Sequence, residues 1–221
     1  MDVNEQIRDI KAQLRLFMNG AVAQSMREKG LTYKLNFGVE LPRLREIASA
    51  LPRDHQLAQA LWKEEIRECK ILAAMLQPAD SFYPEIADIW AENIRTMEIA
   101  ELTCMNLFCW LDYAPAKSFH WIADEREYVQ VCGFLTIARL LGQKGDMDER
   151  ASGEFLDQAV CAVLSGSYPV QTAALRAVCK YMQHSEEHAF RVCRLVEAMK
   201  DSEDPRQRLL YDTVKEETEG I

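Results

Sequence analysis

The sequence has no apolar stretch long enough to cross a membrane. A bilayer-spanning helix needs about 20 consecutive apolar residues, and charged residues interrupt every long apolar stretch of this 221-residue chain. The opening segment, MDVNEQIRDIKAQL, carries charges throughout and lacks the apolar core of a secretion signal. The sequence therefore predicts a cytoplasmic protein that has no contact with membranes.

The chain also lacks the cysteine and histidine spacing of a metal site. Its seven cysteines include no CxxC pair, and Cys104 and Cys109 are five residues apart, a poor spacing for two ligands on one helix face. His184 and His188 are four residues apart but stand in a charged stretch, where we expect them to be solvated. We expect no metal, no cofactor and reduced cysteines that act mainly as small buried hydrophobes.

An array of serine, histidine and aspartate for nucleophilic catalysis is missing, and so is an excess of basic residues. The chain has 26 Lys and Arg against 35 Asp and Glu, a net charge of -9. Indiscriminate binding to nucleic acid needs a basic footprint. The composition therefore argues against such binding, but it does not exclude a local basic groove.

In place of these features, the sequence has helical periodicity almost throughout. Pro42 at the start of a helix is followed by an apolar stripe that includes Leu44, Ile47 and Leu51. No segment shows sustained period-two alternation, so we expect no sheet. The expected helices span residues 3–18, 21–29, 41–51, 55–62, 64–77, 80–94, 99–111, 117–124, 127–142, 155–164, 169–183, 186–200 and 205–219, with a polar turn at 145–153.

Three of the longer helices begin alike, with EYVQVCGF, SYPVQTAAL and DPRQRLLY. Aligning Gln130, Gln171 and Gln207 gives separations of 41 and 36 residues, which fit HEAT-type repeats of two antiparallel helices. Such amphipathic helices bury their stripes only by stacking on neighbours. We predict one all-α domain over residues 1–221, a right-handed α-α superhelix (HEAT-like solenoid) of about six antiparallel helix pairs. Its concave side, made by the second helices, is expected to be less negative than the rest.

Several short signatures follow one another in a recognisable order. They are FGVELPRLR at 37–45, LW at 61–62, EIRE at 65–68, AA at 73–74, HWIA at 120–123 and YVQ at 128–130. Together, from about residue 21 to 183, they resemble the AlkD-like DNA alkylation repair family, within the HEAT-like repeat DNA glycosylase superfamily. The resemblance implies a helical solenoid that holds duplex DNA in its concave groove.

The resemblance also implies a chemistry and a set of residues. Enzymes of this family remove cationic alkylated bases, with an aspartate that stabilises the cationic sugar, aromatic rings beside it and an arginine on a phosphate. In this sequence the aspartate position falls on Thr103, the paired tryptophans on Glu98 and Ile99, and the arginine on Val131. An aromatic position falls on Arg176. The family's catalytic residues are thus expected not to be retained.

Other residues near position 103 are weak candidates for the missing chemistry. Thr103, Asn106 and Trp110 have the spacing i, i+3, i+7 and would share one face of a helix spanning 99–111. Glu101 points about 200° away from Thr103 on a helix, and becomes the candidate carboxylate if the alignment shifts by a few positions. The alternative is a buried helix whose threonine and asparagine hydrogen-bond locally.

Two functions are open at this point. The first is a DNA repair protein that binds duplex or damaged DNA in its groove, with any activity being glycosylase release of alkylated bases. The second is a non-catalytic HEAT-like scaffold for a protein or a structured nucleic acid. Either would be a monomer or a weak dimer. The residues expected on DNA phosphates are Arg43, Arg45, Lys70, Arg176 and Lys180.

Overall fold

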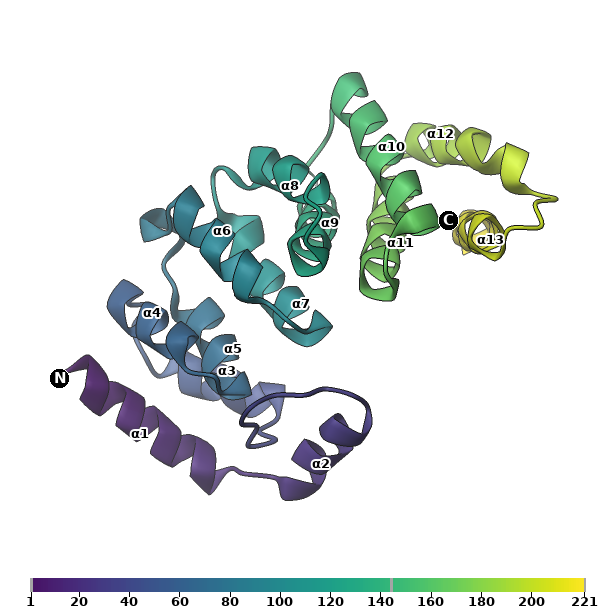
Figure 1. Cartoon of the computed structure of the whole chain (residues 1–221). Coiled ribbons are helices and arrows are strands. Elements are labelled where there is room, and N and C mark those ends of the chain that lie inside the picture. Colours follow the sequence, from purple (N-terminus) through teal and green to yellow (C-terminus); the bar gives the residue numbers. More distant parts are fainter. Residues whose placement is uncertain (1, 144, 221) are drawn as a thin grey trace. The chain divides into compact units, whose positions relative to one another are not determined.

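The computed structural model describes residues 2–143 and 145–220, and this part of the chain forms thirteen α-helices and no strand. None of the described helices is long and apolar enough to cross a membrane. The helices, coloured along the chain in Figure 1, are α1 (Val3–Leu16), α2 (Gly20–Glu28), α3 (Leu41–Ser49), α4 (His55–Lys63), α5 (Arg67–Leu76), α6 (Pro84–Asn93), α7 (Met97–Asn106), α8 (Ala114–Ile122), α9 (Glu127–Gly142), α10 (Glu149–Ser165), α11 (Tyr168–Met182), α12 (Glu186–Val196) and α13 (Pro205–Gly220).

The chain forms two compact units. The N-terminal unit comprises Met1–Ala87 and Met105–Leu111, and the C-terminal unit comprises Asp88–Cys104 and Asp112–Ile221. Each is described by itself below. The expected single domain over the whole chain stays a prediction.

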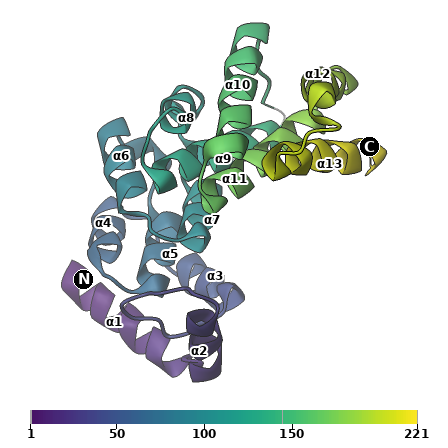
Figure 2. The same cartoon turned by 45° about the vertical axis from the view of Figure 1, so that its right-hand side comes forward.

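In the N-terminal unit, α4 and α5 form the central antiparallel pair. α1 packs on α4, and α3 packs on α5 (Figures 1 and 2). Leu14, Leu44, Leu61 and Leu72, one from each of these helices, are completely buried. The apolar stripes that the sequence shows at helical spacing therefore meet in one core, as stacking of amphipathic helices requires.

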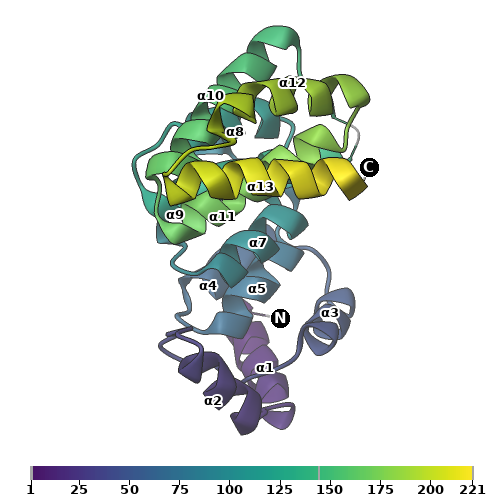
Figure 3. The ribbon, with the colours of Figure 1, turned by 90° about the vertical axis from the view of Figure 1, so that its right-hand side faces the viewer.

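In the C-terminal unit, α9 and α11 are the central helices. α8 packs on α9, α10 packs on α11, and α12 and α13 pack beside α11 (Figure 3). α8 and α9 approach so closely that a Cβ atom at Gly133 would lie 2.6 Å from the backbone nitrogen of Ile122. Only glycine fits at this position of α9.

The repeat signature has a physical basis in this unit. The Gln130 side-chain amide donates to the carbonyl oxygen of Ile122 at 2.9 Å, and Gln171 donates to that of Val163 at 3.0 Å. In both cases the glutamine near the start of one helix satisfies a free carbonyl near the end of the preceding helix. The shared glutamine therefore joins the two helices of a repeat.

Several predicted helix boundaries are wrong, and two of them differ from the structure by about five residues. The helix expected over residues 99–111 ends at Asn106, and a short 3-10 turn at 108–110 follows it. The expected polar turn at 145–153 is too long, because α10 begins at Glu149, capped by the Asp148 side chain, which accepts from the Ala151 N–H at 2.8 Å. An aspartate at this position is a recognised helix start, so the sequence held that signal.

Candidate nucleic-acid interface

A buried ion pair at the start of α5 holds the loop that leads into α3. Glu68 is completely buried, and its carboxylate accepts from the backbone N–H groups of Phe37 and Val39, each at 3.2 Å. Arg67 donates to the Val39 carbonyl at 3.0 Å and to Glu68 at 3.1 Å. Buried charges need such partners. The two signatures FGV and RE are therefore two halves of one structural contact, which we call the loop latch.

Gly38, in the middle of this loop, has a positive φ of 71°. A Cβ atom there would lie 2.2 Å from the carbonyl oxygen of Asn19. The Asn19 N–H in turn donates to the Phe37 carbonyl at 2.9 Å. Because only glycine adopts this conformation at no steric cost, it brings the loop against the start of α2 and fixes where α3 begins.

α3 presents its two arginines to solvent. Arg43 lies 4.2 Å from the centre of the Phe17 ring and forms an ion pair with Glu46. Arg45 is exposed. Lys70, on α5, is directed differently: it is half-buried, and its ammonium donates to the Trp62 carbonyl at 2.9 Å and lies over the Trp62 ring.

Two of the predicted site residues meet in the C-terminal unit. Arg176 on α11 donates to the Glu101 carboxylate on α7 at 2.5 Å, although 75 residues separate them. Their charges therefore neutralise each other. Lys180, one turn further along α11, is exposed and donates to the Gln183 side chain at 2.6 Å.

Thr103 lies inside the C-terminal unit. It is completely buried, and its hydroxyl has no hydrogen-bond partner among the described residues. Its neighbour Cys104 also points inward, where the thiol contacts the Cys132 carbonyl at 3.6 Å and accepts from Thr136 at 3.6 Å. The position that the resemblance assigns to the catalytic aspartate therefore carries no charge and faces the core.

Asn106 and Trp110 do not continue the helical face of Thr103, because α7 ends at Asn106. Leu107 leaves the helical conformation with φ -134° and ψ -62°. Asn106 is half-buried at the helix end, and Trp110 belongs to the 3-10 turn, where its indole N–H donates to the Met105 carbonyl at 3.0 Å. The interpretation of one shared face for the three residues is wrong for Trp110, which is 59% exposed.

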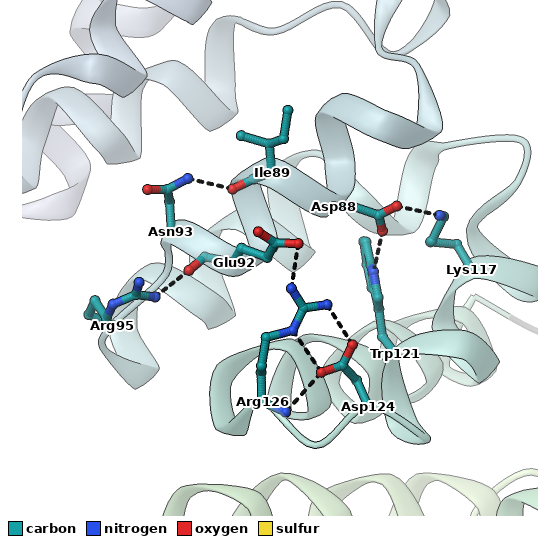
Figure 4. Close-up of polar contacts among 9 residues, drawn as sticks. All are labelled: Asp88, Ile89, Glu92, Asn93, Arg95, Lys117, Trp121, Asp124 and Arg126. Carbon is teal, nitrogen blue, oxygen red and sulfur yellow. Dashed lines mark hydrogen bonds and ion pairs between the residues drawn. The ribbon is translucent and has the colours of Figure 1, made fainter.

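Figure 4 shows a polar cluster between α6 and α8 that the sequence did not reveal. The buried Trp121 donates its indole N–H to Asp88 at 2.8 Å, and Lys117 donates to the other oxygen of the same carboxylate at 2.9 Å. Trp121 belongs to the HWIA signature of the sequence. The tryptophan thus joins α8 to α6 through one carboxylate.

The same figure shows Arg126 held by two carboxylates, at the start of α9. Its guanidinium donates to both oxygens of Asp124, at 2.9 and 2.6 Å, and forms an ion pair with Glu92 on α6. Hydrogen bonding from Arg126 lowers the pKa of Asp124, and the two carboxylates raise the pKa of Arg126. This arginine is thereby neutralised by neighbours of its own unit.

Replacing Asp88 with alanine is expected to lower the free energy of unfolding by about 1–3 kcal/mol, because the buried indole N–H of Trp121 loses this acceptor. Asp88→Asn retains an oxygen for the indole and loses only the charge that faces Lys117, so its effect should be smaller. Urea denaturation followed by circular dichroism measures both. Equal effects of the two substitutions would show that the indole contact contributes nothing.

Comparison with known proteins agrees with this architecture. The family model for DNA alkylation repair enzymes matches residues 10–158, about two thirds of the chain. A solved structure described as a new family of proteins related to the HEAT-like repeat DNA glycosylases, with affinity for branched DNA structures, superposes with a TM-score of 0.79. It is 14% identical, and the match covers 100% of this chain and 95% of that one. Among curated proteins, none matches significantly.

The structural match confirms the predicted fold class: the chain is all-α and has the HEAT-like repeat fold of these glycosylases. The family model covers the loop latch, the Thr103 segment and the Asp88 cluster alike. The expected family resemblance is confirmed, and this chain belongs to the DNA alkylation repair enzyme family.

Proposed function

We propose that this protein binds DNA, including branched DNA, and does not excise bases. The family supports a role in DNA repair, and the solved protein of the same fold has affinity for branched DNA structures. The observation that supports the second half of the proposal is that Thr103, the residue to which the family resemblance assigns the catalytic anion, is neutral and buried.

The chain offers no good substitute for that anion near position 103. Base excision passes through a cationic sugar, which a nearby carboxylate stabilises. Glu101 is the candidate carboxylate on α7, but Arg176 already neutralises it at 2.5 Å. Val131, to which the resemblance assigns the phosphate-binding arginine, is completely buried on α9. DNA binding without excision is what this arrangement supports.

The distribution of charge favours DNA contact through the N-terminal unit. Of the 26 basic and 35 acidic residues, this unit carries 12 of each, and the C-terminal unit carries the remaining 14 and 23. The whole net charge of -9 therefore belongs to the C-terminal unit. Phosphates are attracted to arginines in a neutral surrounding and repelled by an acidic one, so Arg45 and Arg43 on α3 are the favoured contacts. Arg43 would exchange its solvent-exposed ion pair with Glu46 for a phosphate.

Fluorescence anisotropy with a labelled four-way junction and a duplex of equal length tests the proposal. The junction should bind more tightly. The double variant Arg43→Ala, Arg45→Ala should weaken binding about tenfold or more and lower the salt slope by about two, since two phosphate contacts are lost. The matched control is Arg176→Ala, Lys180→Ala, which removes the same charge from the C-terminal unit and should change the affinity little.

Equal losses in the two double variants would contradict the assignment of the contact to α3. Incubation with alkylated duplex should release no base above the uncatalysed rate. Release that Glu101→Gln abolishes would contradict the claim that excision is lost and would identify Glu101 as the carboxylate.

A protein scaffold is the second candidate, and one surface feature favours it. Leu16 and Met18, at the end of α1, are 81% and 61% exposed, and Phe17 between them is 40% exposed. Adjacent apolar side chains on a surface commonly mark a protein contact. Absence of binding to both DNA probes at micromolar protein and low salt would favour this function over the first.

A further inference from the structure

Three potential metal ligands from two different connections meet in the C-terminal unit. Asp146 lies between α9 and α10, His184 lies between α11 and α12, and His188 is in the first turn of α12. The Asp146 carboxylate oxygen is 3.5 Å from His184 Nε2 and 4.0 Å from His188 Nε2. One ligand atom from each of the three residues lies within 4.8 Å of the other two.

The distances between these three side chains suit coordination of one shared metal ion better than direct hydrogen bonds between them. Both oxygen–nitrogen distances are at or beyond the limit of a hydrogen bond. Around a tetrahedral zinc ion with bonds of about 2.0–2.2 Å, neighbouring ligand atoms lie about 3.3 Å apart. Each pair would therefore need to approach by about 1.5 Å or less to coordinate one ion.

The local backbone holds two of the three residues in place. The Gly145 N–H donates to the Leu140 carbonyl at 2.9 Å. A Cβ atom at Gly145 would lie 2.8 Å from that oxygen, so glycine allows the chain to stay close to the end of α9. This contact positions the next residue, Asp146. The Ser185 hydroxyl caps α12 by accepting from the His188 N–H at 3.2 Å. Asp146 and His188 are thus positioned by short-range contacts.

The His188 ring is held in place by packing, but one of its nitrogens has no hydrogen-bond partner among the described residues. It lies against Tyr181, with ring centroids 4.2 Å apart, and its side chain is 13% exposed. Its Nδ1 atom is buried and has no hydrogen-bond partner among the described residues, and Nε2 faces Asp146 across 4.0 Å. The nitrogen without a partner is Nδ1, which faces away from Asp146 and His184, whereas Nε2 is the nitrogen placed to bind an ion shared with them.

Burial lowers the pKa of His188, and the neighbouring His184 contributes in the same direction. Arg191 acts in the same direction, and Asp146 and Glu187 oppose it.

We propose that Asp146, His184 and His188 bind a divalent transition-metal ion, with Zn²⁺ as the preferred ion and water in the fourth position. Two imidazoles and one carboxylate are ligands that zinc takes in proteins. The bound ion would join the α9–α10 connection to the α11–α12 connection and so stabilise the C-terminal unit. The expectation, drawn from the sequence, that the two histidines are solvated is wrong, because their side chains are only 20% and 13% exposed.

Isothermal titration of the full chain with ZnCl₂, after treatment with EDTA, tests the site. Cysteines also bind zinc, so every variant is made in a background in which the accessible Cys161 and Cys193 are serines. Cys179 is retained, because burial raises the pKa of its thiol to about 11 and keeps it protonated. We expect one ion per chain, bound with micromolar affinity, and a melting temperature that rises with Zn²⁺ concentration.

Asp146→Asn and His188→Gln should each weaken zinc binding about tenfold or more and should remove the rise in melting temperature. His120→Gln is the matched control, because His120 is an exposed histidine of the same unit, on α8. Asp146 is 69% exposed, so its substitution should leave the circular dichroism spectrum unchanged. Zinc binding that survives both substitutions, or no binding by the starting protein, would overturn the proposal.

Discussion

Replacing Glu68 with alanine is expected to lower the free energy of unfolding by about 3–5 kcal/mol, the usual cost of breaking a buried ion pair. The substitution removes a completely buried carboxylate that accepts from Phe37 and Val39, and it takes the carboxylate partner from the buried Arg67. Two backbone N–H groups lose their acceptor at the same time. The loop that positions α3 should therefore loosen, and DNA binding through α3 should weaken with it.

Chemical denaturation measures this effect, and Glu65→Ala is its matched control. Glu65 forms an ion pair with Lys34 at 2.5 Å, but both side chains are more than half exposed, so its removal should change stability little. Glu68→Gln should fall between the two, because its amide oxygen retains one acceptor. If Glu68→Ala costs no more than Glu65→Ala, the loop latch does not hold the loop.

Thr103→Asp, which introduces an aspartate at the position that the family resemblance assigns to the catalytic anion, is expected to destabilise the protein by several kcal/mol. Thr103 is completely buried, and its hydroxyl has no partner among the described residues. A carboxylate there would be desolvated, which raises its pKa above the usual value of about 3.9. We also expect no base excision by this variant, because the carboxyl group would be neutral and directed into the core.

The pH dependence of this variant distinguishes desolvation from a simple steric effect. Between the unfolded and the raised folded pKa, the folded state binds more protons than the unfolded state, so stability relative to the parent chain should fall as pH rises. Thr103→Val is the steric control: it removes a buried hydroxyl without a partner and should leave stability unchanged or raise it by about 1 kcal/mol. A Thr103→Asp variant as stable as the parent at pH 7 would show that this position is accessible to solvent.

The sequence predicted helices correctly where apolar stripes are regular and end at strong breaks. α9 has the predicted bounds. α4 ends one residue later than predicted, and α11 begins and ends one residue earlier than predicted. It failed where a helix ends inside an apolar run: from Ile99 to Leu111 the periodicity continues, although the backbone turns at Leu107. Periodicity reports burial, and both a helix and the turn that follows it bury their apolar residues here.

The candidate site was predictable only in its local parts. The glycine and the proline that shape the start of α3 could be read from the FGVELP stretch, because conformational limits of single residues are local. The partners of charged residues could not be predicted from the sequence. The phosphate contacts expected of Arg176 and Lys70 stay predictions. In the structure Arg176 contacts Glu101, 75 residues away, and Lys70 donates to the Trp62 carbonyl.

By itself, the sequence determined that this chain is helical, that its helices stack in repeats, and that it belongs with DNA alkylation repair proteins. Those properties follow from residue spacing and short motifs, both of which are visible in the sequence itself. Only the tertiary structure decided that Thr103 is buried, that Glu68 joins two motifs, and that Asp146 lies beside His184 and His188. Each of these depends on residues distant in the chain, and a charge shows its role only when its partner and its exposure to water are known.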